Sequence, residues 1–167
     1  MMMMMSVLPI LKYPHPVLRQ CCTPVVAFDE ALQALVANMV ETLYACEGAI
    51  GLAAPQVGHP VRVVVIDMQA KTTKDALRVL VNPVVLSASR NKTMREGCLS
   101  FPEYLANVKR AQRVVVEAYT ATGERQEWEA SHLEAVCIQH EIDHLDGVLM
   151  IDRIESLKDD WITRRTL

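Results

Sequence analysis

The sequence IQHEIDHLDG, residues 138–147, has two histidines four positions apart and a glutamate directly after the first. Four residues of an α-helix turn about 400° and advance about 6 Å, so His140 and His144 project side by side from one face. A lone histidine on a helix most often has only a hydrogen-bonding role. The pair with Glu141 between its members instead has the H-E-x-x-H pattern of a helix that binds a divalent metal ion.

Glu141 lies about 100° around the helix from His140, close enough to touch a water on the metal without being a ligand itself. We therefore expect Glu141 to act as a general base. A divalent metal lowers the pKa of its bound water and polarises a carbonyl oxygen. Together these features predict hydrolysis of an amide-like bond.

The third metal ligand is not fixed by the helix. Metalloproteases with this motif take it from downstream, but the downstream sequence LDGVLMIDRIESL has no further histidine. Its oxygen candidates are Asp146, Asp152 and Glu155. Upstream, Cys98 occurs in REGCLSFPEY, which we interpret as a short glycine-containing segment between strands. Its thiolate is the better candidate, although a free cysteine is most often a small buried hydrophobic residue.

The wider chain predicts an α+β fold, with mostly antiparallel β-sheets packed around the metal-binding helix at 131–146. Apolar periodicity predicts an N-terminal helix at 29–46 capped by Asp29, and a short C-terminal helix is expected at 156–166. Ser131 and Glu134 have capping-box spacing. Runs of β-branched residues predict strands at 61–67, 77–86, 113–119 and, more weakly, 125–130. The Gly- and Pro-rich stretch 48–60 predicts a loop that can approach a ligand closely.

The composition limits the class of protein. A chain of 167 residues, 51% hydrophobic, indicates one globular domain over residues 6–167, and we expect the run Met1–Met5 to be disordered. A net charge of -3 without a long basic run argues against nucleic acid or a membrane surface as partner. The sequence lacks a membrane-length apolar stretch, a secretory signal and a disulfide-like cysteine spacing. We expect a cytoplasmic protein with reduced thiols.

Three segments together resemble peptide deformylase: GLAAPQ at 51–56, EGCLS at 96–100 and QHEIDH at 139–144. YPHPVLR near the N-terminus, VNP at 81–83 and Arg110 also fit that family, so the resemblance covers residues 7–155. It implies a metal-dependent hydrolase that removes the formyl group from the N-terminal formylmethionine of newly synthesised polypeptides and releases formate.

The resemblance also implies roles for individual residues. Cys98, His140 and His144 would bind the metal, with water in the fourth position. Glu141 would accept the proton of that water and pass it to the departing amine. The side-chain amide of Gln56 and the backbone N–H of Leu99 would stabilise the oxyanion, each contributing on the order of 3 kcal/mol.

Substrate contacts follow from the same resemblance. Gly51 would let a peptide backbone lie close, in a strand-addition mode. The family binds the methionine side chain in an apolar pocket, and the substrate-binding candidates are Ile50, Leu133, Val136, Cys137 and Glu96, with Met94 weaker. The alternative for the apolar candidates is plain core packing. Asp143 and Arg110 are a candidate pair that holds the helix against the sheet.

Ligand chemistry alone favours zinc for a Cys-His-His site. The resemblance instead implies Fe²⁺ as the native metal, one per chain, with Zn²⁺, Ni²⁺ or Co²⁺ able to occupy the site. Iron with a thiolate ligand predicts oxygen sensitivity. The implied partners are N-formylmethionyl nascent chains and, through a transient contact, the ribosome.

Some positions depart from the family pattern. Ala49 stands where members usually have glycine, and Tyr104 and Leu105 occupy a stretch where many bacterial members have an arginine near the cleft mouth. The preference for residues beyond the methionine is therefore open. The short C-terminal region leaves ribosome docking open as well.

Two other functions fit parts of the sequence. A zincin-like endopeptidase would cleave internal peptide bonds and would use a third ligand other than Cys98. A metal-stabilised peptide-binding module would bind formylated peptides without releasing formate, and it would leave Gln56 and Glu141 without a chemical role.

Overall fold

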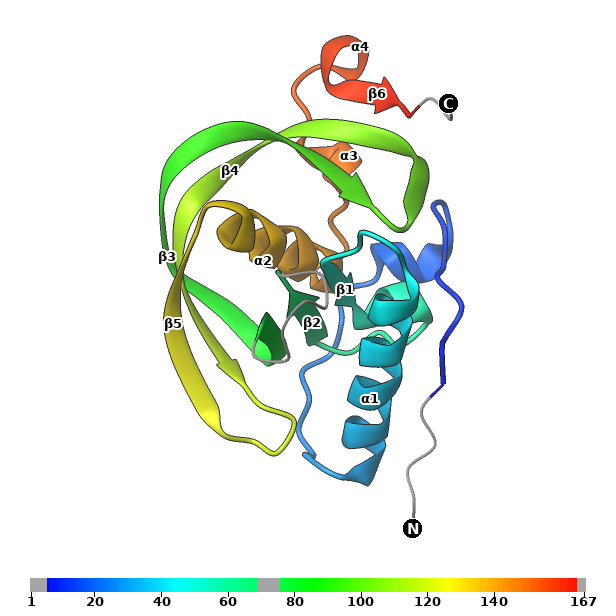
Figure 1. The fold of residues 1–167 in the computed structure, drawn as a ribbon, viewed down its shortest axis with the longest axis vertical. Helices are drawn as coiled ribbons and strands as arrows, with labels where there is room; N and C mark the ends of the chain where they lie inside the picture. The colour runs from blue at the N-terminus through cyan, green and yellow to red at the C-terminus, as the bar shows by residue number, and fades with distance from the viewer. Residues whose placement is uncertain (1–5, 69–75, 165–167) are drawn as a thin grey trace.

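The structure is a computed structural model that describes residues 6–68 and 76–164, and the Met1–Met5 run lies outside them (Figure 1). The strands are β1 (Gly51–Ala53), β2 (Val63–Asp67), β3 (Leu77–Cys98), β4 (Phe101–Tyr119), β5 (Arg125–Ser131) and β6 (Trp161–Thr163). The helices are α1 (Glu30–Ala45), α2 (His132–Leu145), α3 (Met150–Arg153), α4 (Leu157–Asp160) and the 3-10 helices η1 (Pro16–Arg19) and η2 (Ala54–Val57).

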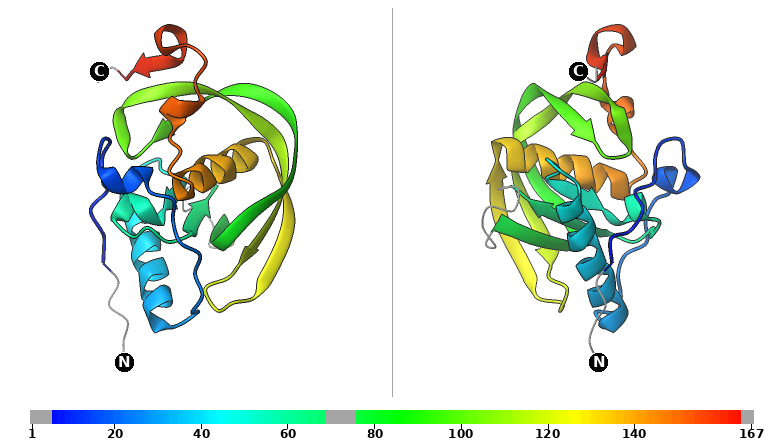
Figure 2. Two further views of the ribbon diagram at one scale, coloured as in Figure 1. Left: turned by 180° about the vertical axis from the view of Figure 1, so that it is seen from behind. Right: turned by 45° about the vertical axis from the view of Figure 1, so that its right-hand side comes forward.

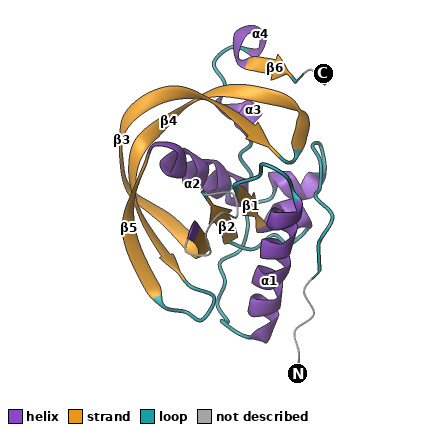
Figure 3. Ribbon diagram, viewed as in Figure 1, coloured by secondary structure: helices purple, strands orange, loops and turns teal. Residues whose placement is uncertain are grey.

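The sheet curves around α2, the helix with the two histidines (Figures 1 and 2). Its strand order is β1-β2-β3-β4-β5, with β6 paired to β4, and every one of these pairs is antiparallel. Figure 3 shows the long β3–β4 ribbon passing over α2, with α1 on the other side of the molecule. The predicted α+β architecture with a central metal-motif helix is confirmed.

The strands β3 and β4 are much longer than the sequence predicted. Residues 86–93 of β3 are exposed, so this stretch lacks the apolar alternation that identifies a half-buried strand. It is extended because its backbone pairs with β4, for example Thr93 with Lys109. Cys98 is therefore the last residue of β3 rather than part of a segment between strands.

Two further expectations about local structure need correction. The stretch 48–60 is not wholly a loop, because β1 pairs with β2 there and η2 follows. The C-terminal helix is the short α4, and the chain then turns into β6; residues 165–167 lie outside the described part.

The predicted helix boundaries are close to those observed. The Asp29 side chain accepts a hydrogen bond from the Leu32 N–H at 3.0 Å, which confirms it as the N-cap of α1. The predicted capping box of α2 is wrong, because Ser131 makes no side-chain capping bond. Glu134 instead accepts a hydrogen bond from the Trp128 indole at 3.3 Å, so its carboxylate is directed away from the helix start.

The strand β2 separates two apolar cores. Val64 and Ile66 pack in the cluster that includes buried residues of α2, whereas Val63 and Val65 pack in the cluster that includes α1. Successive side chains of a strand point to opposite faces, so a fully buried strand joins both clusters. The base of α2 is thereby fixed on the sheet. In the described residues, no helix is long and apolar enough to cross a membrane.

Candidate active site

The two histidines of α2 and the cysteine at the end of β3 meet in space. One ligand atom from each of Cys98, His140 and His144 lies within 4.8 Å of the other two. The Cys98 Sγ is 3.4 Å from the His144 Nε2, and the two imidazole centroids are 5.1 Å apart. Both histidines are buried, and Cys98 is half-buried. The structure thus brings together the three predicted ligands.

This donor set fits a divalent metal ion. One thiolate and two imidazoles suit zinc and other transition metals. Burial is the largest influence on His144 and holds its pKa well below the usual value, which favours the neutral imidazole that a metal needs. The His140 Nδ1 is engaged by Glu96 Oε1 at 2.8 Å, so its Nε2 is the nitrogen available for an ion.

A network of charged side chains extends from His140 through Glu96 and Arg110 to Asp143 and Arg153. Glu96 pairs with the Arg110 guanidinium through two hydrogen bonds, and Arg110 Nη1 donates to Asp143 Oδ2 at 2.8 Å. Arg153 donates to both Asp143 oxygens, at 3.0 and 2.9 Å. Burial would raise the pKa of Glu96, but the hydrogen bonds from His140 and Arg110 outweigh it and lower that pKa. The predicted Arg110–Asp143 pair is therefore part of a larger network that joins α2 to β3 and β4.

Glu141 lies beside the ligands in an apolar environment. Burial, the largest influence, raises the pKa of its carboxyl to about 7. Its Oε1 is buried, and no hydrogen-bond partner for it occurs among the described atoms. A Cβ added to Gly51 would lie 2.7 Å from Glu141 Oε2 and 2.8 Å from Cys137 Sγ. Glycine at position 51 therefore leaves room for this carboxylate.

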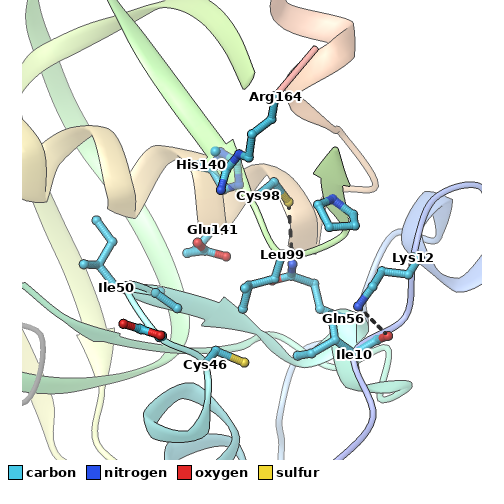
Figure 4. Close-up of a pocket in the computed structure, with 16 residues that line it drawn as sticks. Ile10, Lys12, Cys46, Ile50, Gln56, Cys98, Leu99, His140, Glu141 and Arg164 are labelled. Atoms are coloured by element: carbon cyan, nitrogen blue, oxygen red, sulfur yellow. Dashed lines mark hydrogen bonds between the residues drawn. The ribbon is translucent and has the colours of Figure 1, made fainter. Parts of the chain in front are cut away.

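Gln56 reaches the site from η2 and is buried. Its Oε1 accepts a hydrogen bond from the Ala53 N–H at 3.0 Å, which fixes the orientation of the amide. Its Nε2 donates to Ser100 Oγ at 3.1 Å and lies 3.7 Å from Cys98 Sγ (Figure 4). Leu99, in the turn between β3 and β4, lines the same cleft. The Gln56 Nε2 thus lies between the Ser100 hydroxyl and the sulfur ligand.

The N-terminal segment forms hydrogen bonds with both Gln56 and Ser100. The Leu11 N–H donates to the Gln56 carbonyl at 2.7 Å, and Ser100 Oγ donates to the Leu11 carbonyl at 2.7 Å. The Tyr13 N–H donates to the Ser100 carbonyl at 2.9 Å. Residues 11–13 therefore join η2 to the turn that follows Cys98.

The site opens into two connected hollows. A cleft of about 440 Å³ is lined by Gly51, Gln56, Leu99 and the ligands Cys98 and His140, among others. A smaller cavity of about 190 Å³ is lined by all five side chains of the predicted substrate pocket: Ile50, Glu96, Leu133, Val136 and Cys137. Met94, the weaker candidate, is not part of that described lining.

The comparisons with known proteins agree on one family. The family model for polypeptide deformylase matches residues 7–160. A peptide deformylase of Brucella suis biovar 1 is 46% identical over 162 residues, which are 96% of this chain and 92% of the relative. The chain belongs to the polypeptide deformylase family.

Solved structures of deformylases share the fold. A peptide deformylase from Legionella pneumophila superposes with a TM-score of 0.86 at 40% identity, covering 92% of this chain and 89% of that one. A class I type b peptide deformylase from Acinetobacter baumannii, with Met-Ala-Ser bound, superposes with a TM-score of 0.82 at 33% identity. The match covers 90% of this chain and 100% of that one.

The other oxygen candidates for the third ligand lie elsewhere. Asp146 pairs with Arg62 at 2.9 Å, and Asp152 pairs with Arg19. Neither they nor Glu155 belong to the ligand group found among the described residues. An endopeptidase with one of these ligands therefore has no support from the geometry of this deformylase-family chain.

Sequence reasoning missed several residues of the site. Ser100 closes the EGCLS segment, and its hydroxyl could have been considered as a partner of Gln56. Arg95 lines the smaller cavity, and Lys12 and Arg164 line the cleft. Arg95 and Lys12 directly precede the EGCLS and YPHPVLR segments without being part of them, and Arg164 lies in a C-terminal stretch without a family motif. Tyr104 and Leu105, the departure from many deformylases, lie on β4 where β6 pairs.

Proposed function

We propose that this protein removes the N-formyl group from the N-terminal formylmethionine of newly synthesised polypeptides and releases formate. The observation that carries the proposal is the convergence of Cys98, His140 and His144 beside the buried Glu141, in a chain of the deformylase family. We assign the activity to a single catalytic domain, residues 6–167. Its site of action would be the cytoplasm, where nascent chains emerge, with a transient ribosome contact.

We propose Cys98, His140 and His144 as the ligands of one divalent ion. Fe²⁺ is proposed as the native ion, and Zn²⁺, Ni²⁺ or Co²⁺ would fit the same donor set. When bound, such an ion lowers the pKa of a coordinated water and polarises a carbonyl oxygen. Glu96 would hold the His140 ring in the orientation and tautomer that ligation requires, through their 2.8 Å hydrogen bond.

Glu141 is the proposed general base and acid. Its carboxylate would take a proton from the water that attacks the formyl carbon. It would then deliver that proton to the amine nitrogen as the C–N bond breaks. The products are formate and a peptide whose N-terminal methionine has a free amine. Burial raises the pKa of this carboxyl, which favours the return of the proton in the second step.

Gln56 and Leu99 are the proposed oxyanion donors. The Gln56 Nε2 already faces the sulfur of Cys98, and the Ala53 bond to its Oε1 keeps the amide from turning over. The backbone N–H of Leu99 would be the second donor. A preoriented donor of this kind contributes on the order of 3 kcal/mol to the stabilisation of the transition state.

The methionine side chain would occupy the cavity formed by Ile50, Leu133, Val136, Cys137 and Glu96. That cavity adjoins the reaction site, because His140 and Glu141 line it as well. Its walls are mainly apolar, which suits a thioether side chain. The peptide backbone would lie along Gly51, where the absence of a side chain permits close approach. The Met-Ala-Ser bound to the Acinetobacter relative supports a peptide of this kind as ligand.

The direct test is formate release from formyl-Met-Ala-Ser by protein loaded anaerobically with Fe²⁺ or Ni²⁺. Release from this peptide, with none from its N-acetyl counterpart and none from metal-stripped protein, is expected. Cleavage of internal bonds would indicate an endopeptidase. Tight binding without formate release would indicate a binding module.

A further inference from the structure

The C-terminal strand carries an arginine to the cleft. β6 pairs with β4 through Thr163 and Tyr104, and the Arg164 N–H donates to the Glu103 carbonyl at 2.7 Å. The Trp161 ring stacks on Tyr104, with centroids 4.8 Å apart and planes at 23°. The backbone of Arg164 is therefore held against β4 just outside the site.

The side chain of Arg164 extends over the site. It lines the same cleft as Cys98 and Glu141, and Figure 4 shows it reaching from β6 toward His140 and Cys98. Its Nη2 is 3.0 Å from the position that a Cβ on Gly97 would occupy. A Cβ at position 97 would make a tight contact with this guanidinium, which would have to shift by a few tenths of an ångström.

Arg164 differs in its partners from the arginines of the buried network. Arg110 and Arg153 are paired with carboxylates, whereas no ion pair of Arg164 occurs within residues 6–68 and 76–164. The carboxylates that line the cleft are Glu47 and Glu141, and Glu141 is buried. A guanidinium has five N–H donors in a planar fork that matches a carboxylate. Those donors are available to a ligand in the cleft.

The path of a bound peptide brings it to this arginine. Gly97 lines both the methionine cavity and the cleft. Ile50, His140 and Glu141 line both hollows as well, so a peptide whose first side chain fills the cavity continues into the cleft that Arg164 lines.

We propose that Arg164 is a specificity residue that binds a carboxylate of the peptide beyond the methionine. This inference rests on the proposed function. The carboxylate is either an Asp or Glu side chain at the third residue or, in a short peptide, the C-terminal carboxylate. Because Arg164 is exposed, the gain in kcat/KM is about three- to fivefold at low salt. It decreases as salt is raised, since the Debye length shortens from about 10 Å at 0.1 M to about 3 Å at 1 M and the exposed pair is then screened.

Three peptides test the inference: formyl-Met-Ala-Asn-amide as the neutral reference, formyl-Met-Ala-Asp-amide, and formyl-Met-Ala-Asn with a free C-terminus. The holoenzyme is compared with Arg164→Gln, Arg164→Lys and Arg113→Gln. Arg113 is the control, because it is also exposed but pairs with Glu129 on β5, outside the cleft lining. The readouts are kcat/KM and, by calorimetry, the Kd of each deformylated peptide.

We expect a higher kcat/KM and a lower Kd for a carboxylate peptide than for the neutral reference. The peptide that shows the effect identifies whether Arg164 binds the side-chain carboxylate or the C-terminal carboxylate. Arg164→Gln should remove the preference, Arg164→Lys should keep part of it, and Arg113→Gln should keep all of it. Equal values for the three peptides, or a preference that survives Arg164→Gln, would overturn the inference. A faster Arg164→Gln enzyme on every peptide would also overturn it, because the side chain would then obstruct the cleft.

Failure of the proposed function gives a different result. If the wild-type holoenzyme releases formate from none of the peptides, the deformylase proposal fails. The Kd values of the deformylated peptides are then compared between the wild-type protein and the Arg164 variants. This comparison shows whether Arg164 binds the carboxylate.

Discussion

The two sides of the cleft are built in different ways. On the inner side, His140 and Glu141 are buried, and a chain of hydrogen bonds runs from His140 through Glu96 to Arg110 and beyond. At the mouth, Lys12 and Arg164 are exposed side chains. Under the proposed function, the chemistry therefore depends on buried groups that hydrogen-bond to one another, whereas selectivity beyond the methionine depends on exposed side chains outside that network. Four substitutions test this contrast.

Replacing Glu141 with Gln should have the largest effect. The amide cannot accept the proton of the attacking water, so kcat should fall by about 10²–10⁴-fold. Bound metal, measured by atomic absorption, should stay near one ion per chain, because Glu141 is not a proposed ligand. Wild-type turnover in this variant would remove Glu141 from the mechanism.

Replacing Arg110 with Met should destabilise the fold. It leaves the Glu96 and Asp143 carboxylates buried without this partner, which costs about 3–5 kcal/mol of unfolding free energy. The control is Arg113→Met, whose exposed pair with Glu129 contributes about 0–1 kcal/mol. Urea denaturation of both variants measures the difference, and equal losses would contradict the buried network.

Replacing Gly51 with Ala should displace the Glu141 carboxylate, because the new Cβ would lie 2.7 Å from its Oε2. A displacement of about 1 Å at a reacting group can lower the rate by about 100-fold. The obstructing atoms are side-chain ends that can move, so we expect kcat to decrease while the melting temperature changes little. Unchanged kcat would show that Glu141 has room to work from another position.

Replacing Ala49 with Gly, the usual residue of the family, should have the smallest effect. The extra freedom of the unfolded chain lowers the unfolding free energy by about 0.4–1 kcal/mol. Ala49 lines the cleft but contributes no polar side-chain group to it, so formate release from a neutral formyl-Met peptide should change little. A loss above about 2 kcal/mol in urea denaturation would show that its methyl group is a core contact.

The same contrast explains what could be predicted from the sequence. His140 and His144 were predictable because helical geometry alone brings residues four apart together. Cys98 was the better candidate for the third ligand from the residues alone, and the resemblance assigned it that role, although nothing local shows that the end of β3 meets α2. The extension of β3 over its exposed residues 86–93 was not predictable from periodicity, because the pairing with β4 holds it rather than an apolar face.

Tertiary contacts also overrode two local signals. Ser131 and Glu134 have the spacing of a capping box, but the Trp128 indole engages the Glu134 carboxylate. The C-terminal stretch was predicted as a helix, yet its aromatic residue Trp161 stacks against Tyr104, and the backbone joins β4 as a strand. Arg164 directly follows this strand in the sequence, so its position at the mouth of the cleft could not be predicted either.

The hydrogen bonds of Leu11 and Tyr13 have a practical consequence for work with this protein. Because these two residues connect Gln56 to Ser100, the segment before η1 acts as a clasp across the two halves of the site. A fusion tag attached ahead of Ser6 leaves the clasp intact. A truncation past Tyr13 would remove these two links, and the 3.1 Å hydrogen bond from Gln56 to Ser100 would remain as the direct contact between η2 and the turn after Cys98.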